Sequence, residues 1–198
     1  MTTRRKFIER IALTSFALVA GNVYARQRAD SSVVFTRLVR RKTRALSVKP
    51  GRWKWIVAHH SAIKYGNAAI YGKAHRERGM ENGLAYHFVI GNGIDSGDGE
   101  IEIGPRWLKQ LDGGHVHRED INRVGIGICL VGNFEQGKPT PKQLLAFREL
   151  VEYLRADVVG RIRFAVHKEI DPGRTVCPGR NFPTARMHRL YDRFPTIV

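Results

Sequence analysis

Cysteine and acidic residues are both scarce in this chain of 198 residues. Its two cysteines, Cys129 and Cys177, allow one disulfide at most and exclude the dense disulfide framework of small secreted proteins. The sequence contains no internal repeat and no apolar run of the roughly 20 residues that a bilayer-spanning helix needs. A repeat array and a multi-span membrane protein are therefore excluded.

The overall composition is that of an ordinary globular protein. Hydrophobic residues make up 42% of the chain and charged residues 26%, which excludes wholesale disorder. The length suits one domain that buries a sizeable core without covalent staples. We therefore expect a single domain, preceded by a short leader.

The first 25 residues have the pattern of an export signal. A basic start is followed by an apolar run from Ile11 to Ala20 and by a possible cleavage site after Ala25. Arg4 and Arg5 resemble the pair of the twin-arginine signal, which exports folded proteins. An anchor or a first helix is the alternative, but the run is too short to span a membrane. We expect an exported protein of the periplasm or cell envelope.

Basic residues dominate the rest of the chain. The formal net charge is +16, and removing residues 1–25 takes away four basic residues and one acid, which leaves +13. Such a charge predicts attraction to a polyanion: an anionic membrane surface, an acidic wall polymer, or nucleic acid, which an exported protein rarely meets. The densest cluster, within 37–44, is either a solvated linker or a docking patch. We assign 26–50 to a basic linker and 51–198 to the domain, and we expect a monomer.

Strand and helix patterns alternate along the domain. Thr140, Pro141 and Gln143 form a strong helix start, because they supply an N-cap, a first-turn proline and the second half of a capping box. Apolar β-branched runs predict strands at 53–58, 86–90, 100–103, 124–131 and 163–166, and helical spacing predicts helices at 68–78, 140–154 and 183–193. This alternation predicts an α/β domain with a mixed central sheet and helices on its faces.

Three potential metal ligands follow predicted strands. His59 and His167 each come directly after a strand, and Cys177 follows ten residues later. Two imidazoles and a thiolate fill three corners of a tetrahedral zinc site and leave the fourth for water. Histidines at strand ends more often hydrogen-bond within the core, so spacing alone leaves both interpretations open.

Four sequence segments carry a family resemblance. They read, in order, WIVAHHSA, HRERGMENGLAYHFVIGNG, GGHVHREDINRVGIGICLVGNF and HKEIDPGRTVCPG. In order and spacing they resemble the zinc-dependent N-acetylmuramoyl-L-alanine amidases, the family that also contains phage amidases and the peptidoglycan recognition proteins. The resemblance extends from about Trp53 to Phe182.

The resemblance implies a zinc site and its catalytic neighbours. By matching positions, His59, His167 and Cys177 are the zinc ligands. Tyr86 matches the family's tyrosine beside the zinc site, and we expect it first to orient the attacking water. Thr175 matches a residue that can donate a hydrogen bond to the developing oxyanion.

The resemblance also implies residues that line the substrate cleft. We predict His115 as a cleft residue, with His117 as the alternative, because both precede Asn122 in a segment that resembles the family's G-A-H motif. Asn122, Arg106 and His60, which neighbours the first ligand, complete the predicted substrate-binding set.

The implied function is hydrolysis of the amide bond between N-acetylmuramate and L-alanine in peptidoglycan. Cys129 occupies the position where some family members have a glutamate base, and a disulfide to Cys177 would compete with zinc, so we predict Cys129 to be buried and unpaired. One alternative is a non-catalytic wall-binding module of the same fold. A metal-dependent nuclease is a second alternative, but no paired carboxylates of a two-metal site accompany the histidines.

Overall fold

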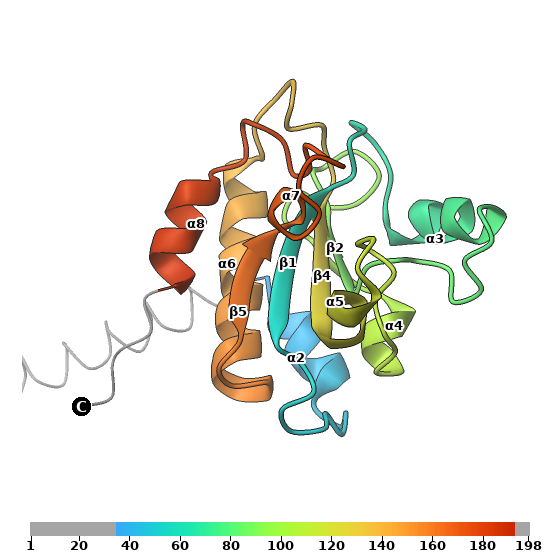
Figure 1. The fold of residues 1–198 in the computed structure, drawn as a ribbon, viewed down its shortest axis with the longest axis vertical. Coiled ribbons are helices and arrows are strands. Elements are labelled where there is room, and N and C mark those ends of the chain that lie inside the picture. Colours follow the sequence, from blue (N-terminus) through green and yellow to red (C-terminus); the bar gives the residue numbers. More distant parts are fainter. Residues whose placement is uncertain (1–34, 193–198) are drawn as a thin grey trace, which may run out of the picture. The chain divides into compact units, whose positions relative to one another are not determined.

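A five-stranded mixed sheet forms the centre of the computed structural model, which describes residues 35–192; the predicted leader at 1–25 lies outside this range. The strand order is β3-β2-β4-β1-β5. Figure 1 shows β2, β4, β1 and β5 side by side in this order. Neighbouring strands among β1, β2, β4 and β5 run parallel, and β3 pairs antiparallel with β2. The strands are β1 Trp55–His60, β2 Phe88–Ile90, β3 Ile101–Ile103, β4 Gly125–Leu130 and β5 Arg163–Val166. The predicted α/β class with a mixed sheet is confirmed.

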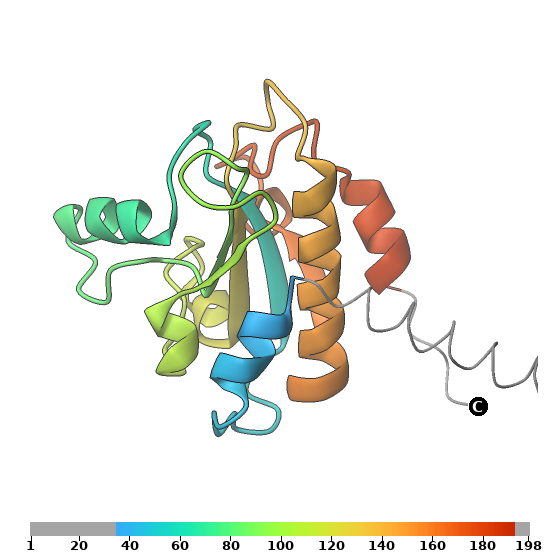
Figure 2. The same ribbon diagram turned by 180° about the vertical axis from the view of Figure 1, so that it is seen from behind.

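Helices cover both faces of this sheet. Figure 2 shows α6 lying along one face with α2 beside it, and the core on this side also takes in α8 and Trp107 of α4. Helices α3, α5 and α7 pack on the other face. The helices are α2 Arg37–Thr43, α3 Ala68–Glu77, α4 Pro105–Leu108, α5 Glu119–Val124, α6 Pro141–Tyr153, α7 His167–Ile170 and α8 Thr184–Tyr191, with a π-helical turn at Leu154–Val158.

Strand alternation divides the core into two sides. Ile56 and Ala58 of β1 belong to the large core under α6, whereas Val57 belongs to a smaller cluster with residues of α5 and α7. Because successive side chains of a strand point to opposite faces, His59 lies on the same face as Val57. This polar end of β1 therefore faces short helices and loops, not the main core.

Helix α6 begins as the sequence predicts. The Thr140 hydroxyl accepts the Gln143 amide N–H at 3.0 Å, and Gln143 Oε1 accepts the Thr140 N–H at 3.1 Å, which completes the capping box. The buried Gln143 Nε2 also donates to the carbonyls of Ile90 and Val131. These bonds fix the start of α6 to the ends of β2 and β4.

The segment that we predicted as a basic linker differs from that prediction between residues 35 and 43. Helix α2 lies within it, and Val39 is fully buried in the main core. Glu149 of α6 accepts the backbone N–H groups of Phe35 and Thr36 at 2.9 and 3.3 Å. A buried apolar side chain and long-range polar contacts, including the ion pair of Arg40 with Asp157, hold this segment, and none of them produces a periodic pattern in the sequence.

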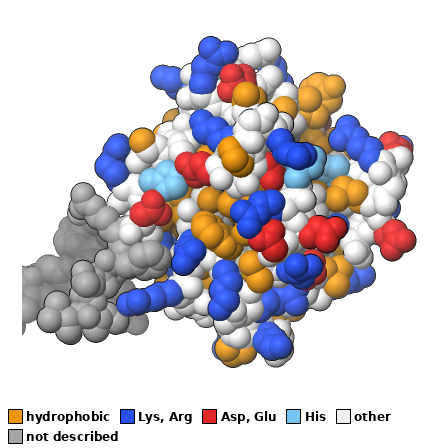
Figure 3. Space-filling model, in the orientation of Figure 1, with side chains coloured by type: hydrophobic (Ala, Val, Ile, Leu, Met, Phe, Trp, Pro, Cys, Tyr) orange, Lys and Arg blue, Asp and Glu red, His pale blue; other side chains and the backbone are white. Residues whose placement is uncertain are grey.

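On the face that carries α5 and α7, the basic side chains are not gathered in one stripe. Figure 3 shows Lys and Arg side chains at several separate places on the face that carries α5 and α7. Within residues 35–192, no helix is both long enough and apolar enough to cross a membrane.

Candidate metal centre

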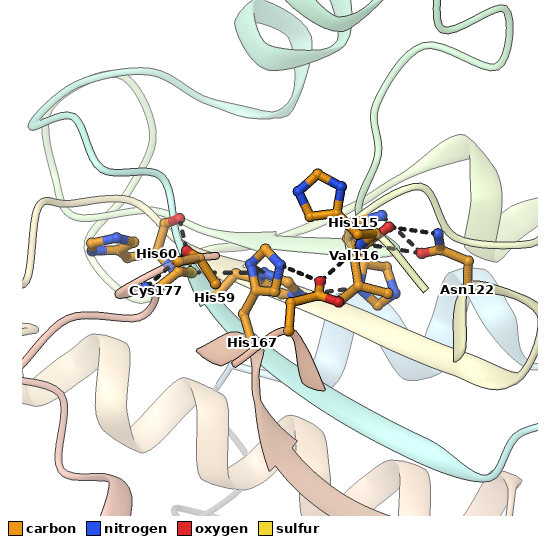
Figure 4. Close-up of polar contacts among 10 residues, drawn as sticks. His59, His60, His115, Val116, Asn122, His167 and Cys177 are labelled. Atoms are coloured by element: carbon orange, nitrogen blue, oxygen red, sulfur yellow. Dashed lines mark hydrogen bonds and ion pairs between the residues drawn. The ribbon is translucent and has the colours of Figure 1, made fainter. Parts of the chain in front are cut away.

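Three predicted ligands meet at the carboxyl ends of two neighbouring strands. His59 lies near the end of β1, His167 is the first residue of α7 directly after β5, and Cys177 lies in the loop that follows. Their ligand atoms all lie within 4.8 Å of one another (Figure 4). His59 Nδ1 is 3.2 Å from His167 Nδ1 and 3.7 Å from Cys177 Sγ. The parallel pairing of β1 with β5 brings these residues together across 108 positions of sequence.

The electrostatic surroundings favour a bound cation. Burial, together with the nearby His115 and His167 rings, holds the pKa of His59 well below its usual 6.5, and burial also lowers the pKa of His167. Both rings are therefore neutral at pH 7 and can offer lone pairs. Burial raises the pKa of Cys177 to about 12, although the His60 N–H, 3.3 Å from the sulfur, opposes this shift. Two neutral imidazoles and a thiol that needs a cation to ionise fit a zinc site.

The loop that carries Cys177 is fixed by Thr175. The Thr175 hydroxyl oxygen accepts the Cys177 N–H at 3.1 Å. Thr175 is partly exposed, and its own O–H proton has no acceptor within the described part of the chain. The hydroxyl can therefore donate to a substrate atom beside the cluster.

Tyr86 lies against the first ligand, just before β2. Its ring centroid is 5.2 Å from that of His59. Burial raises the pKa of the Tyr86 phenol well above 10, and the nearby thiols of Cys129 and Cys177 raise it further. The phenol therefore stays protonated at neutral pH and acts as a hydrogen-bond donor, not as a base.

Cys129 is a free, fully buried thiol in β4, where it pairs in register with His59. Cys177 is also free. The prediction that Cys129 is buried and unpaired is confirmed, so no disulfide competes for the Cys177 sulfur.

His115 and Asn122, which we predicted as cleft residues, make their hydrogen bonds within the protein. The His115 ring is buried behind His59, with Nδ1 3.0 Å from His59 Nε2 and its own Nε2 3.2 Å from the Gly125 carbonyl oxygen. The Asn122 side chain accepts the N–H groups of His115 and Val116 and donates to the Val116 carbonyl (Figure 4). Both residues support the cluster from behind, since their polar atoms are already bonded within the protein.

His60 and Arg106 also differ from the predicted substrate-binding role. Strand alternation turns the His60 ring to the face opposite His59, where Nδ1 accepts the Phe134 N–H at 3.0 Å. The buried Arg106 side chain donates to the backbone carbonyls of Leu84 and Asp112. His117, the alternative to His115, is exposed and stays a candidate for the cleft.

Asp171 is the residue of this site that the sequence analysis missed, because Asp171-Pro172-Gly173 reads as a turn. Its buried Oδ2 lies 3.0 Å from His167 Nε2 and accepts the His117 N–H at 2.8 Å. The signal that could have found it is an acid four residues after a ligand histidine. A cavity of about 760 Å³ lies on the same face between α5, α7 and the starts of β1 and β5, and none of the three candidate ligands lines it.

Known proteins resemble this chain in both sequence and fold. The endolysin of Klebsiella phage KP32 is 31% identical over 109 residues, which cover 52% of this chain and 64% of the endolysin. The solved N-acetylmuramoyl-L-alanine amidase LysC from Clostridium intestinale URNW is 29% identical with a TM-score of 0.59, over 71% of this chain and 86% of LysC. Bumblebee PGRP-SA, with a TM-score of 0.57 and 19% identity over 76% of this chain and 93% of its own, shares the fold. The family model for N-acetylmuramoyl-L-alanine amidase matches residues 49–180, more than half of the chain, and the chain therefore belongs to the N-acetylmuramoyl-L-alanine amidase family.

Proposed function

We propose that this protein is a zinc-dependent hydrolase that cleaves the amide bond between N-acetylmuramic acid and L-alanine in peptidoglycan or its fragments. The observation that carries the proposal is the converged set of His59, His167 and Cys177 within a fold of the amidase family. The LysC amidase, which is similar to this chain, supports the same reaction.

The chain's own residues supply the groups that the reaction needs. His59 Nδ1, His167 Nδ1 and Cys177 Sγ would hold zinc, which supplies a Lewis acid and lowers the pKa of water. The Tyr86 phenol, kept protonated by burial, donates a hydrogen bond that orients the attacking water or the amide oxygen. The Thr175 hydroxyl is a second donor, and each such donor stabilises a developing oxyanion by about 3 kcal/mol.

A non-catalytic wall-binding module of the same fold is the second candidate function. The similarity to peptidoglycan recognition proteins favours it, because solved relatives include such a protein bound to tracheal cytotoxin. The complete donor trio, with a protonated phenol beside it, favours catalysis.

The proposed site of action is outside the cytoplasm. The basic start, the paired arginines and the short apolar run of residues 1–25 support export by the twin-arginine route and removal of this leader. The remaining charge of +13 suits a monomer that works on anionic wall material in the periplasm or envelope. N-terminal sequencing of the protein recovered from the periplasm of expressing bacteria tests this, with Ala25→Leu as the variant expected to block cleavage.

Mass spectrometry of muropeptides incubated with the purified protein tests the reaction itself. We expect release of peptides with a free L-alanine amine, loss of this release after treatment with a chelator, and recovery when zinc is added back. Binding of zinc and muropeptide without any cleavage would support the wall-binding module instead. Cleavage that persists in the chelator would refute the metal assignment.

A further inference from the structure

Each ligand histidine has a second ring nitrogen that points away from the cluster and already has a partner. His59 Nε2 lies 3.0 Å from His115 Nδ1 (Figure 4). His167 Nε2 lies 3.0 Å from Asp171 Oδ2. Both partners are buried. Because a histidine can place a proton on either nitrogen, these partners decide which nitrogen remains free for a metal.

The hydrogen bonds of His115 fix the proton on His59. A carbonyl oxygen can only accept, so His115 Nε2, 3.2 Å from the Gly125 oxygen, carries a proton. The His115 ring is buried, and within residues 35–192 no carboxylate is bonded to either nitrogen, so Nε2 carries its single proton and Nδ1 is an acceptor. His59 Nε2 must then be the donor, which leaves the lone pair of His59 on Nδ1.

Asp171 fixes the second ligand by the same logic. Its carboxylate accepts the backbone N–H of His117 and can only accept from His167 Nε2. His167 therefore also has its lone pair on Nδ1. The two Nδ1 atoms are 3.2 Å apart and both are acceptors. Because two facing lone pairs repel each other, a cation between them would stabilise this arrangement.

The position of His115 is built into the fold. A Cβ at Gly127 of β4 would lie 2.6 Å from His115 Cγ, and one at Gly113 would lie 2.5 Å from His115 Cδ2. The ring thus fills a slot that two glycines leave open. Asn122 holds the backbone N–H of His115 at 3.0 Å. The slot and this bond orient the ring toward His59 before any metal binds.

We propose that His115 and Asp171 are positioning residues, which set the tautomer and orientation of His59 and His167 so that both Nδ1 atoms face the metal. The inference rests on the proposed function only for the identity of the metal as zinc. Partners of this kind typically contribute 10- to 100-fold to metal affinity.

Zinc affinity of matched variants tests the proposal, measured by competition with a chromogenic chelator on the full chain. His115→Phe keeps a planar ring in the slot but removes the acceptor, and Asp171→Ala removes the carboxylate. We expect each to weaken zinc binding about 10- to 100-fold. His115→Asn keeps an oxygen near the place of Nδ1 and should restore most of the affinity. Asp120→Asn, an exposed acid paired with Arg118, is the control and should bind zinc as the wild type does.

Nitrogen-15 NMR of the zinc-loaded wild type gives a second readout that needs no variant. Long-range proton–nitrogen correlations should show Nε2–H in both His59 and His167, with Nδ1 bound to zinc. Binding through Nε2 in either residue overturns the proposal, as does a folded His115→Phe or Asp171→Ala protein with wild-type affinity. Correct tautomers and weakened variants without any amide cleavage would count against the proposed function and leave this inference standing.

Discussion

The substitution Gly127→Ala should disturb the metal centre without touching a ligand. The added Cβ would lie 2.6 Å from His115 Cγ, about 1 Å closer than an ordinary carbon contact. The His115 ring cannot rotate away, since both its nitrogens are bonded and Gly113 closes its other side. The ring must therefore shift and loosen its bond to His59.

The magnitude follows from two costs. Overpacking a buried site costs about 1–3 kcal/mol, and losing the bond to His59 costs about 1 kcal/mol more. For a chain of this length, the sum corresponds to a fall in Tm of roughly 5–15 °C. Thermal unfolding in the presence of a chelator measures this cost without a contribution from bound metal, and chelator competition measures the accompanying loss of zinc affinity.

Gly137→Ala is the matched control, because a Cβ there meets nothing closer than the Asn133 carbonyl oxygen at 4.0 Å and its backbone is not left-handed. We expect this control to melt at or slightly above the wild-type temperature. A Gly127→Ala protein with wild-type Tm and zinc affinity would refute the slot and the role of His115 that depends on it.

Four further predictions concern the candidate ligand Cys177, the Tyr86 phenol, the N-cap of α6 and the dependence of stability on pH. Cys177→Ser should lose zinc on dialysis, as measured by atomic absorption, and full metal content with full activity would remove Cys177 from the ligand set. Tyr86→Phe should lower kcat about 100-fold while leaving zinc affinity unchanged, because the phenol is a donor and not a ligand; unchanged kcat would exclude that role. Thr140→Ala should cost about 1 kcal/mol by removing the cap of α6, seen as a lower urea midpoint, with amidase activity at 25 °C as the internal control. The metal-free protein should lose stability as pH falls below about 6.5, because burial lowers the pKa of six histidines, so that the unfolded chain takes up protons that the folded chain does not. A urea midpoint at pH 5.5 equal to that at pH 8 would contradict this prediction. His188 has the opposite effect, because its hydrogen bonds to Asp192 and Glu169 outweigh its burial and raise its pKa. The six histidines with a lowered pKa are His59, His60, His75, His87, His115 and His167.

Local signals in the sequence predict most of the elements. The Thr140 cap, the apolar run of β4 and the short strands β2 and β3 depend on near neighbours, and the structure confirms them. Helix α2 was missed because it is held by Glu149, more than 100 positions away, and by one buried side chain. Helix α7 was missed because its four residues are too few to show a period.

The sequence by itself predicted the fold class, the family and the three candidate ligands, because the ordered motifs that carry the family resemblance are properties of the chain. Only the tertiary structure decided what the other histidines do. Strand alternation separates His60 from His59, and a contact across 56 positions turns His115 from a predicted cleft residue into the partner of a ligand. Asp171 gains its role in the same way, from the ring nitrogen that the fold directs at it. A sequence motif can identify a residue, but the hydrogen-bond partners of that residue depend on which distant segments the sheet brings together.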